Sequence, residues 1–431
     1  MTGPAPSPAP APPSGTASGS VPVAARRDVG LLFATRVLRM FGYGFLAVVL
    51  VLYLTAIGLS GAETGLLLGL TLLGDAGVSL WLTTHADRIG RRRVLVAGAA
   101  LMLLAGVAFT ATSLLPVLLV AATLGVISPS GNEVGPFLAV EQASLSQLIP
   151  DRGRTQLFAW YQLAGSFATA AGTLTGGALA QAALAGGAQP ADAYRLVIIG
   201  YALVGIVLGG LFLLVSPRVE VPSASVRDEA IATRLGLHRS RGVVLRLSML
   251  FALDAFAGGF AIQSFIAFWF HQRFGVDPGV LGAVLAGANV LAGFSALAAG
   301  RLAARFGLVN TMVFTHLPSN VLLALVPFMP TLPLAVACLF ARFAISQMDV
   351  PTRQSYTMAI VSPDERSAAA GVTGIARSLG VAAAPLIAGP LFATAALASA
   401  PFVISGTLKV VYDLLLYRSF RRLRPPEERP G

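Results

Sequence analysis

The sequence predicts an all-α membrane protein whose twelve transmembrane helices form two six-helix bundles. Composition is the first reason: of 431 residues, 55% are hydrophobic and only 11% are charged. The mean hydropathy of +0.77 leaves too little polar surface for a soluble protein. Apolar segments of about twenty residues also recur, each long enough to cross a ~30 Å hydrocarbon layer at ~1.5 Å per residue. Finally, the second half repeats features of the first.

Twelve segments have the length and apolar character of membrane-spanning helices. Segment 117–147 differs from the others because prolines and glycines interrupt it. The expected helices are 31–57, 64–85, 94–115, 117–147, 155–184 and 194–215 in the first half, and 244–271, 279–299, 308–328, 332–361, 367–394 and 400–417 in the second.

Polar regions separate these helices into domains. Residues 1–27 are mostly Pro, Ala, Ser and Gly and lack the basic start and apolar run of a signal peptide, so we expect a disordered cytoplasmic tail. Residues 217–243 are rich in charge with little apolar periodicity, which indicates a cytoplasmic linker. The expected domains are the tail 1–27, the bundle 28–216, the linker 217–243, the bundle 244–420 and the cytoplasmic tail 421–431.

The basic residues predict the orientation of the chain. Of the 30 Lys and Arg residues, 21 fall in loops and tails on one predicted side, against Arg195 and Arg273 on the other. Cytoplasmic loops carry such an excess of basic residues. We therefore expect the protein to lie in the cell membrane with both termini in the cytoplasm. The net charge of +11 therefore reflects topology and not a nucleic-acid partner. The single cysteine, Cys338, excludes an intrachain disulfide.

The two halves are related at a separation of 217 positions. Gly58-Leu59-Ser60 matches Gly275-Val276-Asp277, and the glycine of the loop 87–93 matches Gly307. Six helices lie between the copies, and an even number of crossings gives both copies the same orientation. The sequence therefore predicts two six-helix units in parallel repeat.

The loop between the second and third predicted helices has the most specific order of residues in the chain. It reads Asp87-Arg88-Ile89-Gly90-Arg91-Arg92-Arg93. Ordinary flanking charge is one reading. The order closely resembles the loop between helices 2 and 3 of the major facilitator superfamily, in particular its bacterial efflux-type members. The resemblance implies a cytoplasmic latch formed by Asp87, Arg88, Gly90, Arg91, Arg92 and Arg93, in which Asp87 faces the N-terminus of the eleventh helix, where a carboxylate is stabilised. Thr83 departs from the family's usual glycine.

Four acidic residues lie at membrane depth and are candidates for proton coupling or substrate contact: Asp75, Glu133, Glu141 and Asp254. Ionisable groups there cost about 2.5 to 3.5 kcal/mol and usually face a cavity or a partner. Asp75 has no charged residue within a helical turn, so burial favours its protonated form. The alternative for Asp75 and Glu133 is a structural salt bridge to Arg342, Arg377 or an arginine of the first helix.

Cationic and polar side chains gather on helices that the resemblance places around a central cavity, the first, fourth, seventh and tenth. Arg342, Ser346, Asp349 and Arg353 follow i, i+4, i+7, i+11 and share one face of a continuous helix. Asp349 and Arg353 could simply neutralise each other. Arg36 and Arg39 cluster on the first helix, and Arg377 could meet an acid or an anionic substrate. His85 and His316 are expected to be packing or interface residues, and Lys409 to pair with Asp413 or to snorkel.

Together these features predict a secondary active transporter that moves a small organic solute by alternating access. Proton-coupled efflux is the preferred reading, with partial support from a glycine pattern at 172–177 that is similar to the family's antiport motif. Exchange or import of an organic anion is the alternative, and a non-transporting receptor or scaffold is the alternative of another class. We expect no cofactor, no metal site and no enzymatic activity, because phosphate loops, metal-ligand clusters and nucleophile elbows are missing. The expected partners are protons, the solute and the bilayer, with the protein as a monomer.

Overall fold

The computed structural model describes residues 23–148, 151–220, 239–362, 365–421 and 423. Most of the tail 1–27, of the linker 217–243 and of the tail 421–431 lies outside these residues. Within them all the regular elements are helices. The first half contains α1 (Val23–Ala47), α2 (Leu50–Ala56), α3 (Gly61–Ile89), α4 (Arg91–Ala111), α5 (Leu115–Leu124), α6 (Phe137–Leu148), α7 (Asp151–Ala185), α8 (Pro190–Leu214) and η1 (Pro217–Val219).

The second half repeats the order of the α-helices. It contains α9 (Arg241–Gly259), α10 (Gln263–Phe274), α11 (Pro278–Phe306), α12 (Leu308–Leu325), η3 (Val326–Phe328), α13 (Leu332–Ser346), α14 (Asp349–Ile360), α15 (Arg366–Ala393) and α16 (Ala400–Phe420). Ten helical segments of the described chain are long and apolar enough to cross a membrane. The other two of the twelve expected spans correspond to α5 with α6, which are separated, and to α7.

The internal repeat is visible in the backbone. Gly90 (φ 103°) joins α3 to α4, and Gly307 (φ 85°) joins α11 to α12 at the matching position. Gly58 (φ 94°) and Gly275 (φ 65°) form a second matching pair. Only glycine adopts such angles readily, so each pair marks a turn that both halves need at the same place.

The first, fourth, seventh and tenth expected helices are each divided in two, as α1/α2, α5/α6, α9/α10 and α13/α14. The sequence indicated an interruption only in the fourth, so the expectation that the other three are continuous was wrong. Pro351 explains one of them, because its nitrogen cannot donate to the carbonyl of Gln347 where α13 ends. Gly258 and Gly259 weaken the end of α9. No glycine or proline marks the interruption at Val48 and Val49.

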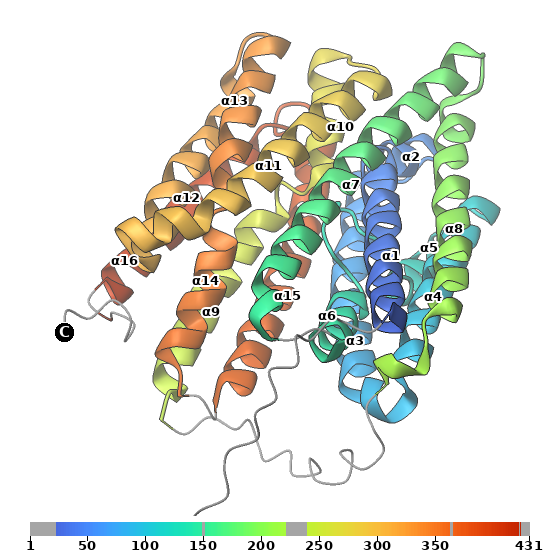
Figure 1. Ribbon diagram of the computed structural model, residues 1–431. Coiled ribbons are helices and arrows are strands. Elements are labelled where there is room, and N and C mark those ends of the chain that lie inside the picture. The colour runs from blue at the N-terminus through green and yellow to red at the C-terminus, as the bar shows by residue number, and fades with distance from the viewer. Residues whose placement is uncertain (1–22, 149–150, 221–238, 363–364, 422, 424–431) are drawn as a thin grey trace, which may run out of the picture.

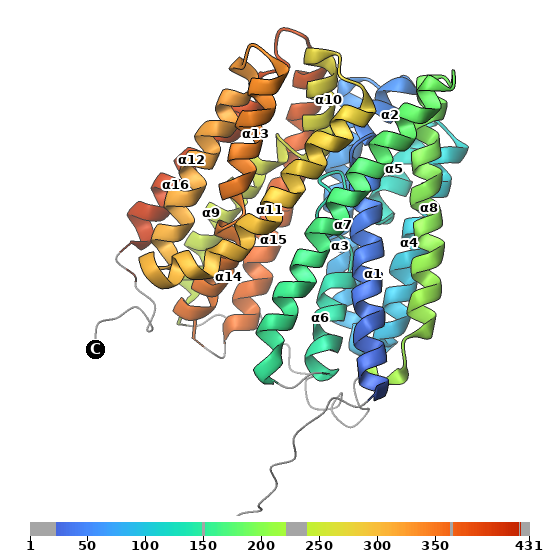
Figure 2. The same ribbon diagram turned by 45° about the horizontal axis from the view of Figure 1, so that its top comes forward.

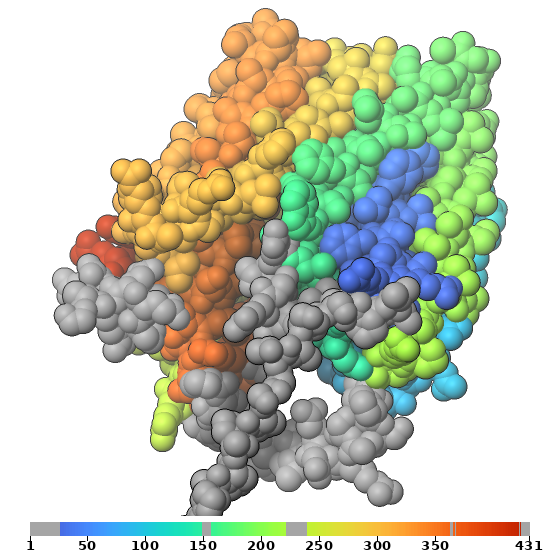
Figure 3. All heavy atoms as spheres, viewed as in Figure 1, coloured from blue at the N-terminus to red at the C-terminus, as the bar shows by residue number. Residues whose placement is uncertain are grey.

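The two halves lie side by side, with α11 against α7 and α15 against α3 (Figures 1 and 2). We call the end of the molecule with the Gly90 and Gly307 turns the loop side and the opposite end, with Gly58 and Gly275, the far side. The space-filling view shows a continuous surface at the far side, where α10 and α11 meet α7 (Figure 3).

Glycines carry the far-side contact between the halves. A Cβ added to Gly65 would lie 2.3 Å from the carbonyl oxygen of Pro385, and one added to Gly389 would lie 2.2 Å from that of Gly61. A Cβ on Gly282 would lie 2.5 Å from the carbonyl oxygen of Thr173. Backbones approach this closely only where side chains are missing. The far side is therefore closed by direct contact of α3 with α15 and of α7 with α11.

The same helix pair is apart at the loop side. A Cβ added to Gly77 of α3, or to Gly371 or Gly374 of α15, would lie more than 4 Å from any atom outside its own helix. The halves therefore meet at the far side and diverge toward the loop side along α3 and α15.

Candidate functional site

A compact set of ion pairs occupies the first half at membrane depth; we call Arg36, Arg39, Glu133 and Glu141 the N-half network. Arg39 of α1 donates to Glu133 at 2.8 Å and to Glu141 at 2.7 and 2.8 Å. Arg36, one turn earlier, pairs with Glu133. Two guanidinium groups thus face two carboxylates from the fourth expected helix.

Neutral donors and aromatic rings complete the N-half network. Tyr161 of α7 donates to Glu141, and Thr35 donates to the same carboxylate at 2.9 Å. The Arg36 guanidinium lies 4.5 Å from the centre of the Tyr161 ring. Arg36, Arg39 and Glu141 are at most 1% exposed. Charges buried so deeply persist only when they are paired and hydrogen-bonded, as these are. The alternative expected for Glu133, a salt bridge to the first helix, is the one the structure contains.

Asp75 of α3 is placed differently from the other three membrane-depth acids. Its carboxylate accepts hydrogen bonds from Ser79 at 3.1 Å and from the backbone N–H of Gly135 at 2.6 Å. Among the described residues no cation lies within 4.0 Å of it. Gly135 belongs to the unwound segment between α5 and α6, so the hydrogen bond from its N–H to Asp75 holds that segment against α3. The charged carboxylate accepts this bond more strongly than the protonated carboxyl group does.

The second half has its own buried cluster around Asp254 of α9; we call it the C-half network. One carboxylate oxygen accepts from Lys409 of α16 at 2.5 Å. The other accepts from Arg353 of α14 at 3.2 Å and from Arg377 of α15 at 3.1 Å. Arg353 also pairs with Asp349 at 2.9 Å, so the pair expected from their i, i+4 spacing is present. Asp254 therefore ties together four helices of the second half.

The C-half network extends to residues for which the sequence indicated no special role. His316 of α12 lies with Nδ1 2.8 Å from Asp413 and with Nε2 3.9 Å from Asp254. Asn320 donates to Asp413 at 2.9 Å. Lys409 bonds Asp254 and not Asp413, so the expected local pair was wrong, and His316 has more than a packing role. Separations of 93 to 155 positions join these residues, which spacing within one helix cannot reveal.

Arg342 of α13 remains without an acidic partner within 4.0 Å among the described residues. Its Nε is buried without a hydrogen-bond partner, and so is the Oγ of Ser346 one turn later. The expected polar stripe is interrupted because α13 ends at Ser346 and α14 begins at Asp349. Asp349 and Arg353 join the C-half network, whereas Arg342 and Ser346 offer free donors.

The expected latch residues contact their own half in this conformation. Asp87, whose side chain is 52% exposed, accepts from Arg91 at 2.8 Å. Arg91 also donates to Gln147 at 3.0 Å and to the carbonyl oxygen of Val219 at 3.2 Å. The expected contact of Asp87 with the N-terminus of α15 is therefore replaced by a bond within the first half, because α3 and α15 are apart at the loop side.

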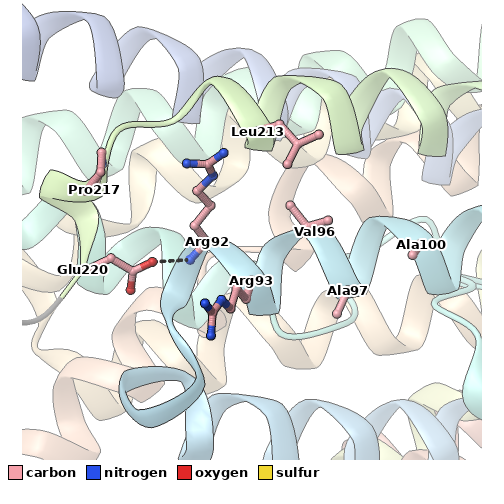
Figure 4. Close-up of a pocket in the computed structure, with 8 residues that line it drawn as sticks. All are labelled: Arg92, Arg93, Val96, Ala97, Ala100, Leu213, Pro217 and Glu220. Carbon is pink, nitrogen blue, oxygen red and sulfur yellow. Dashed lines mark hydrogen bonds between the residues drawn. The ribbon is translucent and has the colours of Figure 1, made fainter.

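Glu220, at the start of the expected linker, caps the N-terminus of α4. Glu220 accepts from the backbone N–H groups of Arg91 at 2.7 Å and of Arg92 at 3.1 Å, where free N–H groups favour a carboxylate. Beside it lies a groove of about 500 Å³ between α4 and α8 (Figure 4). Its walls include the apolar side chains of Val96 and Leu213, and Arg92 and Arg93 lie at its loop-side end. Arg88 is exposed on α3.

These features define a multi-pass helical membrane protein made of two repeated halves, with charged networks at membrane depth and interrupted helices beside them. A family model described as Major Facilitator Superfamily matches residues 32–385 and 272–431. The chain belongs to the major facilitator superfamily.

One curated relative and two solved structures indicate the range of similar proteins. The chain is 31% identical over 420 residues to the uncharacterized membrane protein YJR124C of Saccharomyces cerevisiae, covering 91% of this chain and 94% of the relative. It is similar in fold to the xylose transporter XylE from E. coli in a partially occluded inward-open conformation, at 16% identity and TM-score 0.71, covering 94% of this chain and 100% of XylE.

The second structure is a bacterial homolog of the human lysosomal transporter Spinster in an inward-facing and occupied conformation. It is 17% identical, with TM-score 0.71, and the match covers 94% of this chain and 98% of that chain. At such identities the likeness concerns the fold, and the family points to a transporter and not to an enzyme.

Proposed function

We propose that this protein is a secondary active transporter that moves a small organic solute across the cell membrane by alternating access, as a monomer with both termini in the cytoplasm. The supporting observation is the asymmetry of its contacts: the halves meet through Gly61, Gly65, Gly282 and Gly389 at the far side, whereas α3 and α15 are apart at the loop side. Two repeated halves that are packed together at one end and separated along one helix pair at the other are the arrangement that rocking around a central site requires.

Proton coupling is the second part of the proposal, and Asp75 is its main residue. The carboxyl groups of Glu133, Glu141 and Asp254 are each bound by arginine or lysine side chains. Asp75 has only a hydroxyl and a backbone N–H as partners. Loss of its charge would weaken the bond to Gly135 and loosen the segment between α5 and α6.

Efflux is the direction that we propose. It is supported by the likeness of residues 172–177 to the antiport pattern and by the place of these residues, since Thr173 and Gly177 pack against Gly282 in the far-side contact. A change of packing at this contact would open or close the far side, through which an exported solute would leave.

Exchange or import of an organic anion is the second candidate, and Arg342 favours it. A buried guanidinium nitrogen without a partner costs free energy unless a ligand supplies an acceptor. A carboxylate or phosphate of a solute would satisfy it.

The deciding experiment is a solute screen in vesicles that contain the purified protein, run with and without a proton gradient. We expect protein-dependent flux of at least one small organic solute, with accumulation that changes when the gradient is reversed. Preference for cationic or neutral solutes supports efflux, and preference for anions that Arg342→Gln abolishes supports the second candidate. A folded protein that moves none of the solutes and instead retains a partner protein through its linker would be a receptor or scaffold.

Asp75→Asn tests the coupling residue. We expect the variant to exchange solute between equal concentrations but to lose accumulation driven by a proton gradient, because an amide cannot release a proton. Ser79→Ala is the matched control, since it removes one hydrogen bond to Asp75 and leaves the acid in place. Gradient-driven accumulation that survives in Asp75→Asn contradicts the assignment.

A further inference from the structure

The imidazole of His316 lies between two carboxylates that come from two different helices. Its Nδ1 is 2.8 Å from Oδ1 of Asp413 on α16, and its Nε2 is 3.9 Å from Oδ1 of Asp254 on α9. His316 is 5% exposed, Asp254 3% and Asp413 1%. A histidine held between two buried acids is an unusual arrangement for a residue that only fills space.

The two ring nitrogens have different tasks. A nitrogen and a carboxylate oxygen 2.8 Å apart need one hydrogen between them, and we assign it to Nδ1, which then donates to Asp413. The amide nitrogen of Asn320 donates to the second oxygen of Asp413 at 2.9 Å and lies 3.0 Å from Nδ1. In the neutral ring Nε2 is then the unprotonated nitrogen, and it faces Oδ1 of Asp254, which already accepts from Lys409. Nε2 is thus a vacant position for a proton beside an acid.

The surrounding charges balance when the ring is neutral. Three acids, Asp254, Asp349 and Asp413, are matched by three cations, Arg353, Arg377 and Lys409. Tyr412 of α16 packs edge-on against the imidazole, 5.9 Å between ring centres. Arg342, on the adjacent α13, forms no ion pair with this set among the described residues. A proton on Nε2 would therefore place a fourth cation around Asp254.

The three cations differ in how easily each can break its ion pair with Asp254. The side chain of Arg377 is 35% exposed, against 8% for Arg353 and 10% for Lys409. Moving a buried charge away from its partner is costly unless water can solvate it. Of the three, Arg377 can replace its bond to Asp254 with hydration by water at the lowest free-energy cost. It belongs to α15, which contacts α3 at the far side but not at the loop side.

We propose that His316 is a proton-binding site of the C-half network, and that a proton taken up on Nε2 displaces Arg377 from Asp254. The proton comes from water and forms the Nε2–H bond; the hydrogen bond from Arg377 to Oδ2 of Asp254 breaks, and no other covalent bond changes. Proton uptake in one half is thereby converted into release of α15 from α9. The value of this site for transport depends on the proposed function, but proton binding itself does not.

The test uses ring-labelled histidine in the full-length protein, reconstituted in lipid and followed by nuclear magnetic resonance from acid to neutral pH. The chain has four histidines, so each ring can be assigned by a single His→Gln variant. We expect the His316 signal to convert to the doubly protonated form on acidification. Lys409→Met should move the midpoint of that conversion to higher pH, and Asp413→Asn to lower pH, each by about one unit or more, which is the effect of one charge at this range.

Hydrogen exchange of α15 measures the displacement of Arg377. After correction for the chemical effect of pH, amides around Arg377 should exchange faster below the His316 midpoint in the wild type and show no such change in His316→Gln. His85→Gln is the matched control, because it removes a half-buried histidine of α3 that bonds the carbonyl oxygen of Trp81, and it leaves the C-half network intact.

Two results overturn the proposal. One is a His316 ring that stays singly protonated throughout the titration, or whose midpoint is unchanged in both Lys409→Met and Asp413→Asn. In each case the signals of the other three histidines must show that the protein is folded. The other is exchange in α15 that does not follow the protonation of His316. Neither result bears on solute flux, so failure of this site and failure of the proposed transport function are separate outcomes.

Discussion

Arg39 shows how this protein keeps charge at membrane depth. It is fully buried, yet its guanidinium bonds both Glu133 and Glu141, and a phenylalanine ring lies 4.6 Å from it. Arginine suits such a place because its planar fork can donate to two carboxylates at once. Arg36 and Glu133 complete a set of two positive and two negative groups, so the network holds no net charge in the membrane.

Arg39→Met tests this account at the level of one residue. The substitution leaves Glu141 and Glu133 short of a partner in a buried place, and we expect the free energy of unfolding to fall by about 3 to 5 kcal/mol. Thermal unfolding of the purified protein in detergent measures the loss. The double variant Arg39→Met/Glu141→Gln should recover part of it, because the orphaned charge is removed.

The exposed pair of Arg195 and Asp192 is the control for this prediction. Their side chains are 38% and 60% exposed, and Arg195→Gln should change stability by no more than about 1 kcal/mol. Equal losses from Arg39→Met and Arg195→Gln would mean that the N-half network does not stabilise the fold.

Individual residues also show where the sequence stops being informative. It identifies Asp75, Glu133, Glu141 and Asp254 as membrane-depth acids because each interrupts an apolar run. It does not give their partners, since Asp254 and Lys409 are 155 positions apart and meet only through the packing of α9 against α16. Lys409 and Asp413 lie at i, i+4 and looked like a pair, but a stronger contact in another helix displaced that local preference.

At the scale of helices, glycine contacts decide which side of the molecule is closed. Gly65 of α3 lies so close to Pro385 of α15 that an added Cβ would be 2.3 Å from its carbonyl oxygen. Backbone atoms cannot move aside as a flexible side chain can, so a methyl group at this position separates the two helices.

Gly65→Ala should therefore open the far side. Overpacking costs about 1 to 3 kcal/mol, enough to shift a two-state equilibrium by about fivefold to a hundredfold. Spin labels at Gln189→Cys and Gln272→Cys, with Cys338 replaced by serine, report the distance between the halves at that side. We expect a longer distance in Gly65→Ala. Gly77→Ala on the same helix meets nothing within 4 Å and should leave the distance unchanged; a longer distance there as well would refute the explanation.

The helix breaks mark the limit of prediction at this scale. The positive-φ turns at Gly58, Gly90, Gly275 and Gly307 follow a repeat that the sequence already contains. The break between α5 and α6 was foreseen from its prolines and glycines, and the break before α14 is explained by Pro351. The break at Val48 and Val49 has no such residue. There the carbonyl oxygen of Ala47 accepts from Ser264 of α10 at 2.7 Å, a contact 217 positions away that local propensity does not indicate.

For the whole molecule, the loop 87–93 determines how the loop side closes. In the present conformation Asp87 is half exposed and bonded to Arg91 across the Gly90 turn, a partly exposed ion pair that contributes about 0.2 to 1 kcal/mol. The family resemblance places the same carboxylate at the N-terminus of α15 once the loop side is closed. A charge at a helix start is worth about 0.3 to 1 kcal/mol, and up to ~2 kcal/mol when partly buried. Asp87 therefore favours the closed loop side more than the open one.

Asp87→Asn should then leave stability within about 0.5 kcal/mol but shift the population toward the open loop side. Spin labels at Arg218→Cys and Arg305→Cys, one in each half, measure the opening, and the solute exchange rate should fall because closure becomes less frequent. Arg301→Gln is the control, since it changes a charge in the matching loop of the second half, where Ala304 stands in place of the acid. If Asp87→Asn and Arg301→Gln alter the distance distribution equally, general surface charge and not a specific latch controls closure, and the two halves close symmetrically.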